Sequence, residues 1–156
     1  MTSIAELVAK DIMESSVVCI GAHEELIEVG ERLINAHVTG LPVVEEGRLV
    51  GIVTRSDFVR APVLLKTMDE YVSDHLQEDS LQQQPRTEFD GFRSRLRHLT
   101  VADVMTTEVV TCALDTSVEE IGTKMVLHHI HRVVVIDDDR PVGIVGSLDL
   151  VKLLGR

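Results

Sequence analysis

The feature that most constrains this chain is an internal repeat with an offset of 92 residues. The stretch GIVTRSDF at 51–58 returns as GIVGSLDL at 143–150, with Gly, Ile, Val and Asp kept in place. The offset holds without gaps over residues 11–59, where 15 of 49 positions are identical and many others exchange one apolar residue for another. A repeat of this length indicates two structural copies that bury their apolar faces together.

Each copy is predicted to run in the order β-α-β-β-α, which makes the chain a mixed α/β (α+β) protein. After a short β-rich stretch, each copy has an amphipathic helix with apolar residues at helical spacing: Leu26, Val29, Leu33 and Ile34, then Val118, Ile121, Met125 and Val126. A strand pair with an acidic turn follows, and the final helix begins near Ser56 in one copy and near Ser147 in the other.

The repeat divides the chain into repeat 1 at 1–60, a connector at 61–99 and repeat 2 at 100–156. The connector is predicted to begin as a helix and to be mobile at about 77–91, where polar and turn-forming residues replace apolar anchors. Ser3-x-x-Glu6 and Thr100-x-x-Asp103 resemble capping boxes that open short helices.

Gly30 and Gly122 occupy the same interior position of the first long helix in both copies. Glycine there costs about 1 kcal/mol relative to alanine. Its recurrence predicts the close approach of another element, for which the matching helix of the other copy is one candidate.

Composition excludes several classes of function. The net charge of −11, with 26 acidic and 15 basic residues, argues against a nucleic-acid surface, although a local group of basic residues could still hold an anionic ligand. No apolar run approaches the roughly 18 residues of a membrane span, and the N-terminus lacks the basic start of a secretory signal. Cys19 and Cys112 form no C-x-x-C pair, so we expect a reducing cytoplasm, though two cysteines leave a disulfide open.

Thr54-Arg55-Ser56-Asp57 lies where a strand is predicted to pass into a helix. Free backbone N–H groups and the helix dipole favour an anion at such a junction. The hydroxyls of Thr54 and Ser56 suit a phosphate, and the Asp57 carboxylate can accept from both hydroxyls of a ribose, as acidic residues do in dinucleotide sites. Thr-x-x-Asp is also a helix-capping pattern, and taken alone that interpretation is the stronger one.

The second copy helps to separate these two interpretations. Asp149 stands at the position of Asp57, whereas Gly146 stands at the position of Thr54 and has no side chain that could cap a helix. The persistence of Asp149 therefore favours a use other than capping, and Ser147 is the candidate to take over as the cap in this copy.

With these motifs in place, the chain resembles a tandem pair of cystathionine-β-synthase (CBS) domains, or Bateman module. The resemblance is carried by DIM and DVM, by TGLPVVEEGRLVGIVTRSD, and by HRVVVIDDDRPVGIVGSLD, and it covers nearly the whole chain apart from the connector. It implies two repeats packed about a pseudo-twofold axis through their sheets. It also implies adenosine-containing ligands in clefts between the copies, and regulation of an enzyme or transporter.

The resemblance also assigns roles to individual residues. The family's ribose and phosphate motif, Gly-apolar-x-Thr/Ser-x-x-Asp, is complete in copy one as Gly51, Thr54 and Asp57. Copy two keeps Gly143 and Asp149 but has Gly146 at the hydroxyl position and Leu148 in place of Ser56, which puts its phosphate contacts in doubt. In kinase-regulating members a His-Arg pair contacts nucleotide phosphates, and His131-Arg132 stands at that place, where copy one has Thr39-Gly40. The expected ligand-binding residues are therefore Thr54, Ser56, Asp57, His131, Arg132, Ser147 and Asp149.

Other motifs give no support to a metal site or an enzyme. Adjacent histidines such as His128 and His129, with His131, rarely converge on one ion, and a solvated turn explains the acidic run at 137–139. No nucleophile elbow, Walker loop, Gly-x-Gly-x-x-Gly or His-Glu-x-x-His occurs. We therefore predict no catalytic residues, no metal and no obligatory cofactor.

Together these observations predict a cytoplasmic regulatory module that binds AMP, ADP or ATP. It is expected to form a homodimer, because half-buried helices carrying Leu26, Val29, Leu33 and their counterparts should leave an apolar surface that a second chain covers. It is also expected to control an unidentified enzyme or transporter in trans, with no nucleic-acid partner and no membrane insertion. S-adenosylmethionine and NAD also present an adenosine and are less favoured. The alternative is a dimerisation or interaction scaffold whose ligand sites are vestigial, which Gly146 and Leu148 favour and which Thr54, Ser56 and Asp57 oppose.

Overall fold

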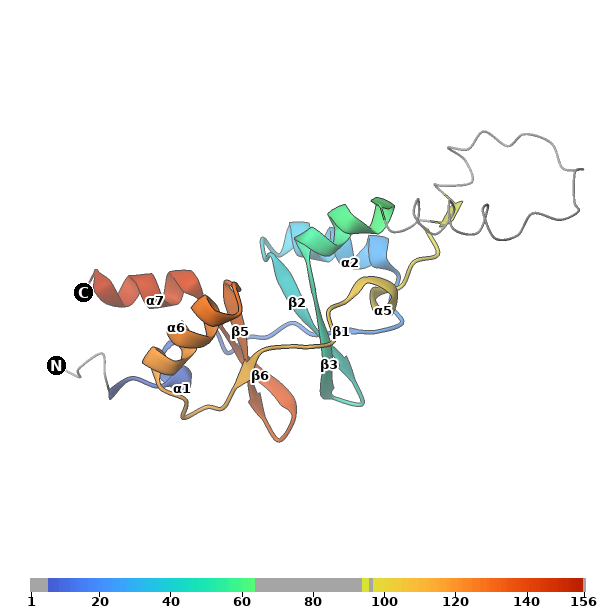
Figure 1. The fold of residues 1–156 in the computed structure, drawn as a ribbon. Helices are drawn as coiled ribbons and strands as arrows, with labels where there is room; N and C mark the ends of the chain where they lie inside the picture. The colour runs from blue at the N-terminus through green and yellow to red at the C-terminus, as the bar shows by residue number, and fades with distance from the viewer. Residues whose placement is uncertain (1–5, 64–93, 96, 156) are drawn as a thin grey trace, which may run out of the picture. The chain divides into compact units, whose positions relative to one another are not determined.

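The computed structural model describes residues 6–63, 94–95 and 97–155 (Figure 1). The connector segment predicted to be mobile, at about 77–91, lies outside these residues. The chain divides into two compact units, one of which comprises residues 1–20, 41–52 and 106–156, and the other residues 21–40 and 53–105.

The first repeat has the predicted element order. It contains α1 (Ala9–Ile12), β1 (Ile20–Gly21), α2 (Leu26–Asn35), β2 (Gly40–Glu45) and β3 (Arg48–Thr54). A helix follows directly at residues 55–63 and runs through Pro62. The three strands form one sheet in the order β1-β2-β3.

The second repeat has the same elements at the expected offset. It contains α5 (Val101–Val104), β4 (Thr111–Cys112), α6 (Val118–Leu127), β5 (Arg132–Asp137), β6 (Arg140–Gly146) and α7 (Ser147–Leu154). In its three-stranded sheet β4 is parallel to β5, and β5 is antiparallel to β6. The prediction of a mixed α/β protein with two β-α-β-β-α repeats is confirmed.

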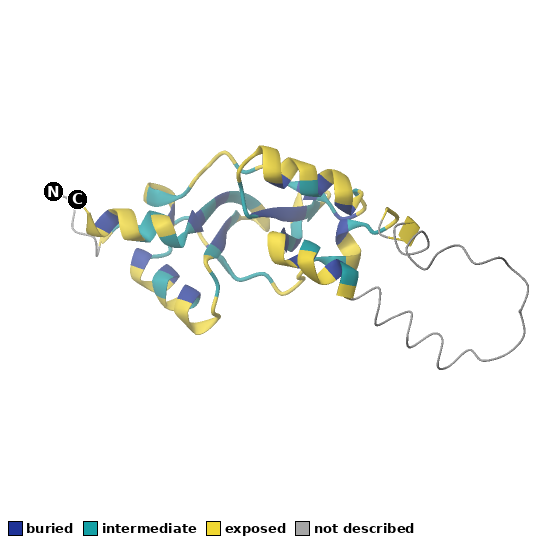
Figure 2. Ribbon diagram, turned by 90° about the horizontal axis from the view of Figure 1, so that it is seen from above, coloured by how far each residue is buried: buried dark blue, intermediate teal, exposed yellow. Residues whose placement is uncertain are grey.

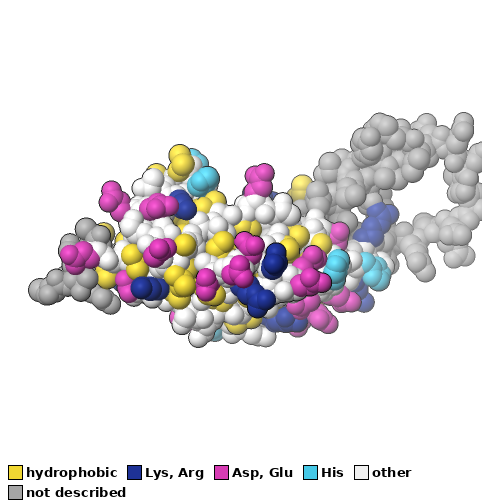
Figure 3. Space-filling view, turned by 90° about the horizontal axis from the view of Figure 1, so that it is seen from below, with side chains coloured by type: hydrophobic (Ala, Val, Ile, Leu, Met, Phe, Trp, Pro, Cys, Tyr) yellow, Lys and Arg dark blue, Asp and Glu magenta, His cyan; other side chains and the backbone are white. Residues whose placement is uncertain are grey.

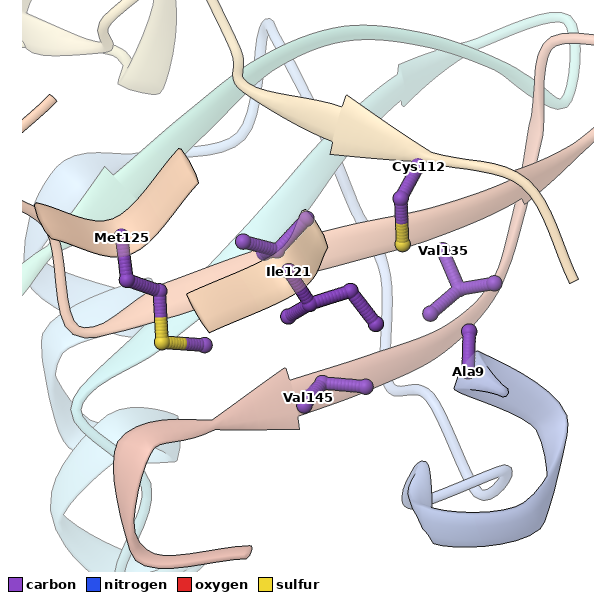
Figure 4. Packing of buried hydrophobic residues seen from close by; sticks show 7 residues of the cluster. Ala9, Cys112, Ile121, Met125, Val135 and Val145 are labelled. Carbon is purple, nitrogen blue, oxygen red and sulfur yellow. The ribbon is translucent and has the colours of Figure 1, made fainter. Parts of the chain in front are cut away.

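The apolar core of the second repeat lies between its sheet and helix α6 (Figure 4). Side chains of α6, β4, β5, β6 and α1 meet there, and the buried members of the cluster are Ala9, Cys112, Ile121, Met125, Val133, Val135 and Val145. In Figure 2 the strands are largely buried, whereas the helices keep an exposed outer face. Both cysteines are free thiols, and burial raises the pKa of each.

The paired glycines face the final helix of their own repeat, so the suggestion that they meet the other copy's helix was wrong. A Cβ added at Gly30 would lie 2.9 Å from Cε1 of Phe58. At Gly122 the corresponding neighbour is Leu150, whose Cδ1 would be 3.8 Å away, an ordinary contact. Phe58 and Leu150 are themselves 92 residues apart, so the same helix pair packs in both repeats, more tightly in the first.

A carboxylate three residues past the N-cap closes the first turn of both short helices. The Thr100 N–H and Oγ1 donate to Asp103 Oδ2 at 2.8 and 2.9 Å, which confirms that capping box. For α1 the pair is the Val8 N–H and Asp11 Oδ2, at 3.0 Å. The predicted Ser3-x-x-Glu6 box lies partly outside the described residues, and α1 begins at Ala9.

Candidate functional site

The candidate site of the first repeat is built at the point where β3 ends and the 55–63 helix begins. Asp57 Oδ2 accepts from the Thr54 N–H at 2.7 Å and from Thr54 Oγ1 at 2.8 Å, and Thr54 Oγ1 lies 2.8 Å from Ser56 Oγ. The structure therefore brings Thr54, Ser56 and Asp57 into one hydrogen-bonded cluster. Asp57 is only 5% exposed and is the one buried charged residue among those described.

Only one oxygen of the Asp57 carboxylate accepts hydrogen bonds from the described residues. Both donors from Thr54 reach Oδ2, and among the described residues none donates to Oδ1. Capping thus accounts for one oxygen of a buried carboxylate and leaves the other available to a hydroxyl donor. The capping and ribose interpretations are compatible at this residue, because they use different oxygens.

Thr39 is a further candidate site residue, which the sequence interpretation missed. Its carbonyl accepts from the Arg55 N–H at 3.0 Å, so it lies beside the same turn. Its Oγ1 is buried and has no hydrogen-bond partner within the described part of the chain, although buried hydroxyls are normally bonded. Its position 92 residues before His131, a predicted ligand residue, is the signal that could have found it.

Gly40 allows the two strand ends of the first repeat to approach each other. A Cβ there would lie 3.1 Å from both Thr54 Cγ2 and the Val53 carbonyl oxygen. In the second repeat Arg132 stands at the position of Gly40, and Gly146 stands at the position of Thr54. Arg132 and Gly146 are paired in the β5–β6 register. The second repeat therefore lacks the Thr54 hydroxyl but has the Arg132 guanidinium on the neighbouring strand.

The junction of β6 and α7 forms the corresponding candidate site in the second repeat. The Gly146 N–H donates to Asp149 Oδ2 at 2.9 Å, and the Ser147 N–H donates to the His131 carbonyl at 3.0 Å. Two expectations need correction. Gly146, not Ser147, is the N-cap of α7, and Asp149 does act in capping, because its carboxylate needs only a backbone N–H.

Asp149 also has a cationic partner, whereas Asp57 has none among the residues that the structure describes. Lys152 Nζ lies 2.9 Å from Asp149 Oδ1, so both oxygens of this carboxylate are occupied. Partial burial alone would raise the pKa of Asp149. The hydrogen bond from Lys152, the Gly146 N–H and the charges of Lys152 and Arg132 outweigh burial and hold this pKa below its usual value.

The predicted residues are divided between the two compact units. Thr54, Ser56 and Asp57 are held together by hydrogen bonds in one unit. His131, Arg132, Ser147 and Asp149 lie together in the other unit, joined through the β5–β6 register and the first turn of α7. The two groups differ in chemistry, since the first contains the hydroxyls of Thr54 and Ser56, whereas the second contains one hydroxyl, of Ser147, and the Arg132 guanidinium.

The described surface carries no sign of a metal site or a membrane span. In residues 6–63, 94–95 and 97–155, no group of three or more His, Cys, Asp or Glu side chains is placed to hold a metal ion. Nor does that part of the chain contain a helix with the length and apolar character needed to cross a membrane. The face in Figure 3 shows acidic side chains spread among basic and apolar ones.

Comparison with known proteins identifies relatives for both repeats. The CBS domain family model matches residues 9–64 and 101–156. The CBS domain of a CBS domain containing membrane protein from Sphaerobacter thermophilus is 36% identical, with a TM-score of 0.71 over 96% of this chain and 89% of that one.

Two further relatives are similar over nearly all of this chain. The CBS domain pair of protein MJ0100, solved in complex with 5′-methylthioadenosine and S-adenosyl-L-methionine, is 28% identical with a TM-score of 0.70, over 96% of each chain. L-aspartate semialdehyde sulfurtransferase of Methanocaldococcus jannaschii is 29% identical over 94% of this chain. The chain spans only 23% of that enzyme's length, and 42% of another curated relative from the same organism.

Proposed function

We propose, because the chain belongs to the CBS domain family, that it is a regulatory module that senses an adenosine-containing ligand. The ligand class proposed is an adenine nucleotide such as AMP, ADP or ATP, and the output is control of a partner enzyme or transporter in trans. A ligand can shift only an equilibrium between states that it binds unequally, so the partner must distinguish the occupied from the empty module.

The observation that carries this proposal is the Asp57 carboxylate. It is nearly fully buried, one oxygen is held by both donors of Thr54, and the other has no donor within the described residues. Among the described residues this second oxygen is not one of the fully buried, unpaired side-chain atoms, so it is open to a hydroxyl donor that a ligand supplies. A ribose offers two adjacent hydroxyls. The Ser56 hydroxyl remains as a donor to a phosphate, because Asp57 holds both donors of Thr54.

A ligand panel tests the proposal. Thermal shift and calorimetry with adenosine, AMP, ATP, S-adenosylmethionine and NAD are expected to show a melting temperature that rises with the concentration of at least one of them. GMP and inorganic phosphate serve as controls for the base and for charge alone. The scaffold alternative, in which the sites are vestigial, predicts no shift with any of the five adenosine ligands.

S-adenosylmethionine is a second candidate, supported by the relative that is 28% identical and was solved with it and 5′-methylthioadenosine. These two ligands lack phosphate, so they need the ribose contact but no cationic partner. The hydroxyl-rich site around Asp57 suits them better than the site at Asp149, where Lys152 and Arg132 lower the carboxyl pKa. The panel therefore ranks phosphorylated against unphosphorylated ligands.

We also propose a homodimer, on grounds that differ from the predicted ones. The residues expected to leave an apolar surface, Leu26, Val29 and Leu33, are buried within the chain, so that reasoning was wrong. Other apolar side chains are exposed at matching positions of the two repeats, in the pairs Ile34 with Val126 and Val59 with Val151. Recurrence at the same positions gives each repeat an equivalent apolar surface, which favours contact with a second copy.

Val151→Glu is expected to give a monomer of 17.3 kDa in light scattering at micromolar concentration, whereas the unchanged chain gives a dimer. The substitution places a carboxylate on a face that the proposed contact would desolvate, which is unfavourable without a partner. Val18→Glu is the control, because Val18 is 55% exposed but lies outside the helices. A monomeric unchanged chain would rule out the homodimer.

A further inference from the structure

The contact between Lys152 and Asp149 gives the two candidate sites different access to their carboxylates. Lys152 lies three residues after Asp149 on α7, and its Nζ is 2.9 Å from Oδ1. Oδ2 of the same carboxylate accepts from the Gly146 N–H. A ribose hydroxyl that approaches Asp149 therefore meets a carboxylate with both oxygens already hydrogen-bonded.

The first repeat has a cation at the same spacing but not the same contact. Arg60 lies three residues after Asp57, yet within the described residues no ion pair joins the two. The difference follows from the residue at the end of the strand. Thr54 supplies two donors to a buried Asp57, whereas Gly146 supplies only its backbone N–H and leaves Asp149 accessible to a lysine.

We propose that Lys152 is a specificity-determining residue of the second repeat's site. Its ammonium contacts the Asp149 oxygen that a ribose hydroxyl needs, and Lys152 therefore selects against uncharged adenosine ligands. An uncharged ligand competes with the ammonium for Oδ1 and offers it no acceptor in return. A phosphorylated ligand offers the displaced ammonium a new anionic acceptor. This inference rests on the proposed function, because it assumes that Asp149 receives a ribose.

The size of the effect follows from the exposure of the pair. Lys152 is 72% exposed, so the ion pair is screened by solvent and contributes little. Competition of that strength corresponds to a change in affinity of about two- to fivefold. The effect is therefore best measured as a ratio between two ligands that share the adenosine and differ in charge.

Calorimetry with adenosine and AMP tests the inference on the full chain carrying Asp57→Ala, which leaves Asp149 as the ribose acceptor. Adding Lys152→Gln is expected to tighten adenosine binding about two- to fivefold and to leave AMP binding unchanged or weaker. The matched control is Arg60→Gln in a chain carrying Asp149→Ala, where the ratio of the two affinities should stay the same because Arg60 does not hold Asp57. An unchanged ratio with Lys152→Gln, or no binding of either ligand with or without it, overturns the inference.

A ligand-free measurement separates this inference from the proposed function. NMR titration of the Asp149 carboxyl is expected to show a higher pKa in Lys152→Gln than in the unchanged chain, because the ammonium stabilises the charged form. An identical pKa in both chains overturns the inference even if adenosine ligands bind. If the wild-type chain binds no adenosine ligand while the Asp149 pKa does rise in Lys152→Gln, the proposed function is wrong. The proposed effect of Lys152 on the choice of ligand is then wrong as well.

Discussion

Asp57→Ala is expected to weaken the binding of adenosine ligands about ten- to a hundredfold, the largest effect of any single substitution at the candidate sites. The substitution removes the acceptor of the ribose hydroxyls, and charge-assisted hydrogen bonds of this kind contribute about 1.5–3 kcal/mol. Calorimetry with adenosine and AMP measures the loss. Asp149→Ala should have the smaller effect, because Lys152 already occupies that carboxylate.

Asp57 also caps a helix, so its replacement lowers stability whether or not a ligand binds. The loss of the cap should reduce the free energy of unfolding by about 1 kcal/mol. Asp103→Ala is the matched control, because Asp103 accepts from the N–H and Oγ1 of Thr100 as Asp57 does from Thr54. The two variants should lose similar stability, but only Asp57→Ala should lose ligand affinity. If Asp57→Ala binds every adenosine ligand as tightly as the unchanged chain, the ribose role is wrong and capping alone explains the residue.

The element order could be predicted from the sequence because its signals are local. The spacing of Leu26, Val29 and Leu33 fixes the buried face of α2, and the β-branched runs on either side of an acidic turn fix the hairpins. What those faces pack against is not a local property. For this reason the buried face of α2 was predicted correctly. The exposed apolar surface, however, was assigned to residues that are buried, and Gly30 was expected to contact a helix of the other repeat.

The candidate site was predictable only in part, for a related reason. Asp57 and Asp149 have the same spacing from their strands, but the capping rule considers the side chain at the N-cap and therefore misjudged Gly146. A carboxylate three residues on can close the helix with a backbone N–H that every residue except proline carries. The ion pair of Lys152 was equally hidden, because Arg60 has the same spacing from Asp57 and forms no such pair within the described residues.

Gly143→Ala is expected to lower the free energy of unfolding by about 1–3 kcal/mol, the usual cost of overpacking a filled site. Gly143 is buried on β6, beside the segment that follows α1. An added Cβ would overlap Sδ of Met13 and lie 2.9 Å from its Cγ. A glycine inside a strand often marks such a close approach, and here Met13 occupies the space that a side chain would need. Chemical denaturation of the two chains measures the difference.

Two controls assign this loss to the contact with Met13. In a chain carrying Met13→Ala the space is vacated, so Gly143→Ala should cost less there than in the unchanged chain, and the double-mutant cycle should give a non-zero coupling. Gly122→Ala is the matched glycine control. A Cβ there meets only Leu150 at 3.8 Å, and an alanine inside α6 should raise stability by about 0.5–1 kcal/mol. Equal costs of Gly143→Ala with and without Met13 would show that the methionine does not fill this space, and the strand glycine would then need another explanation.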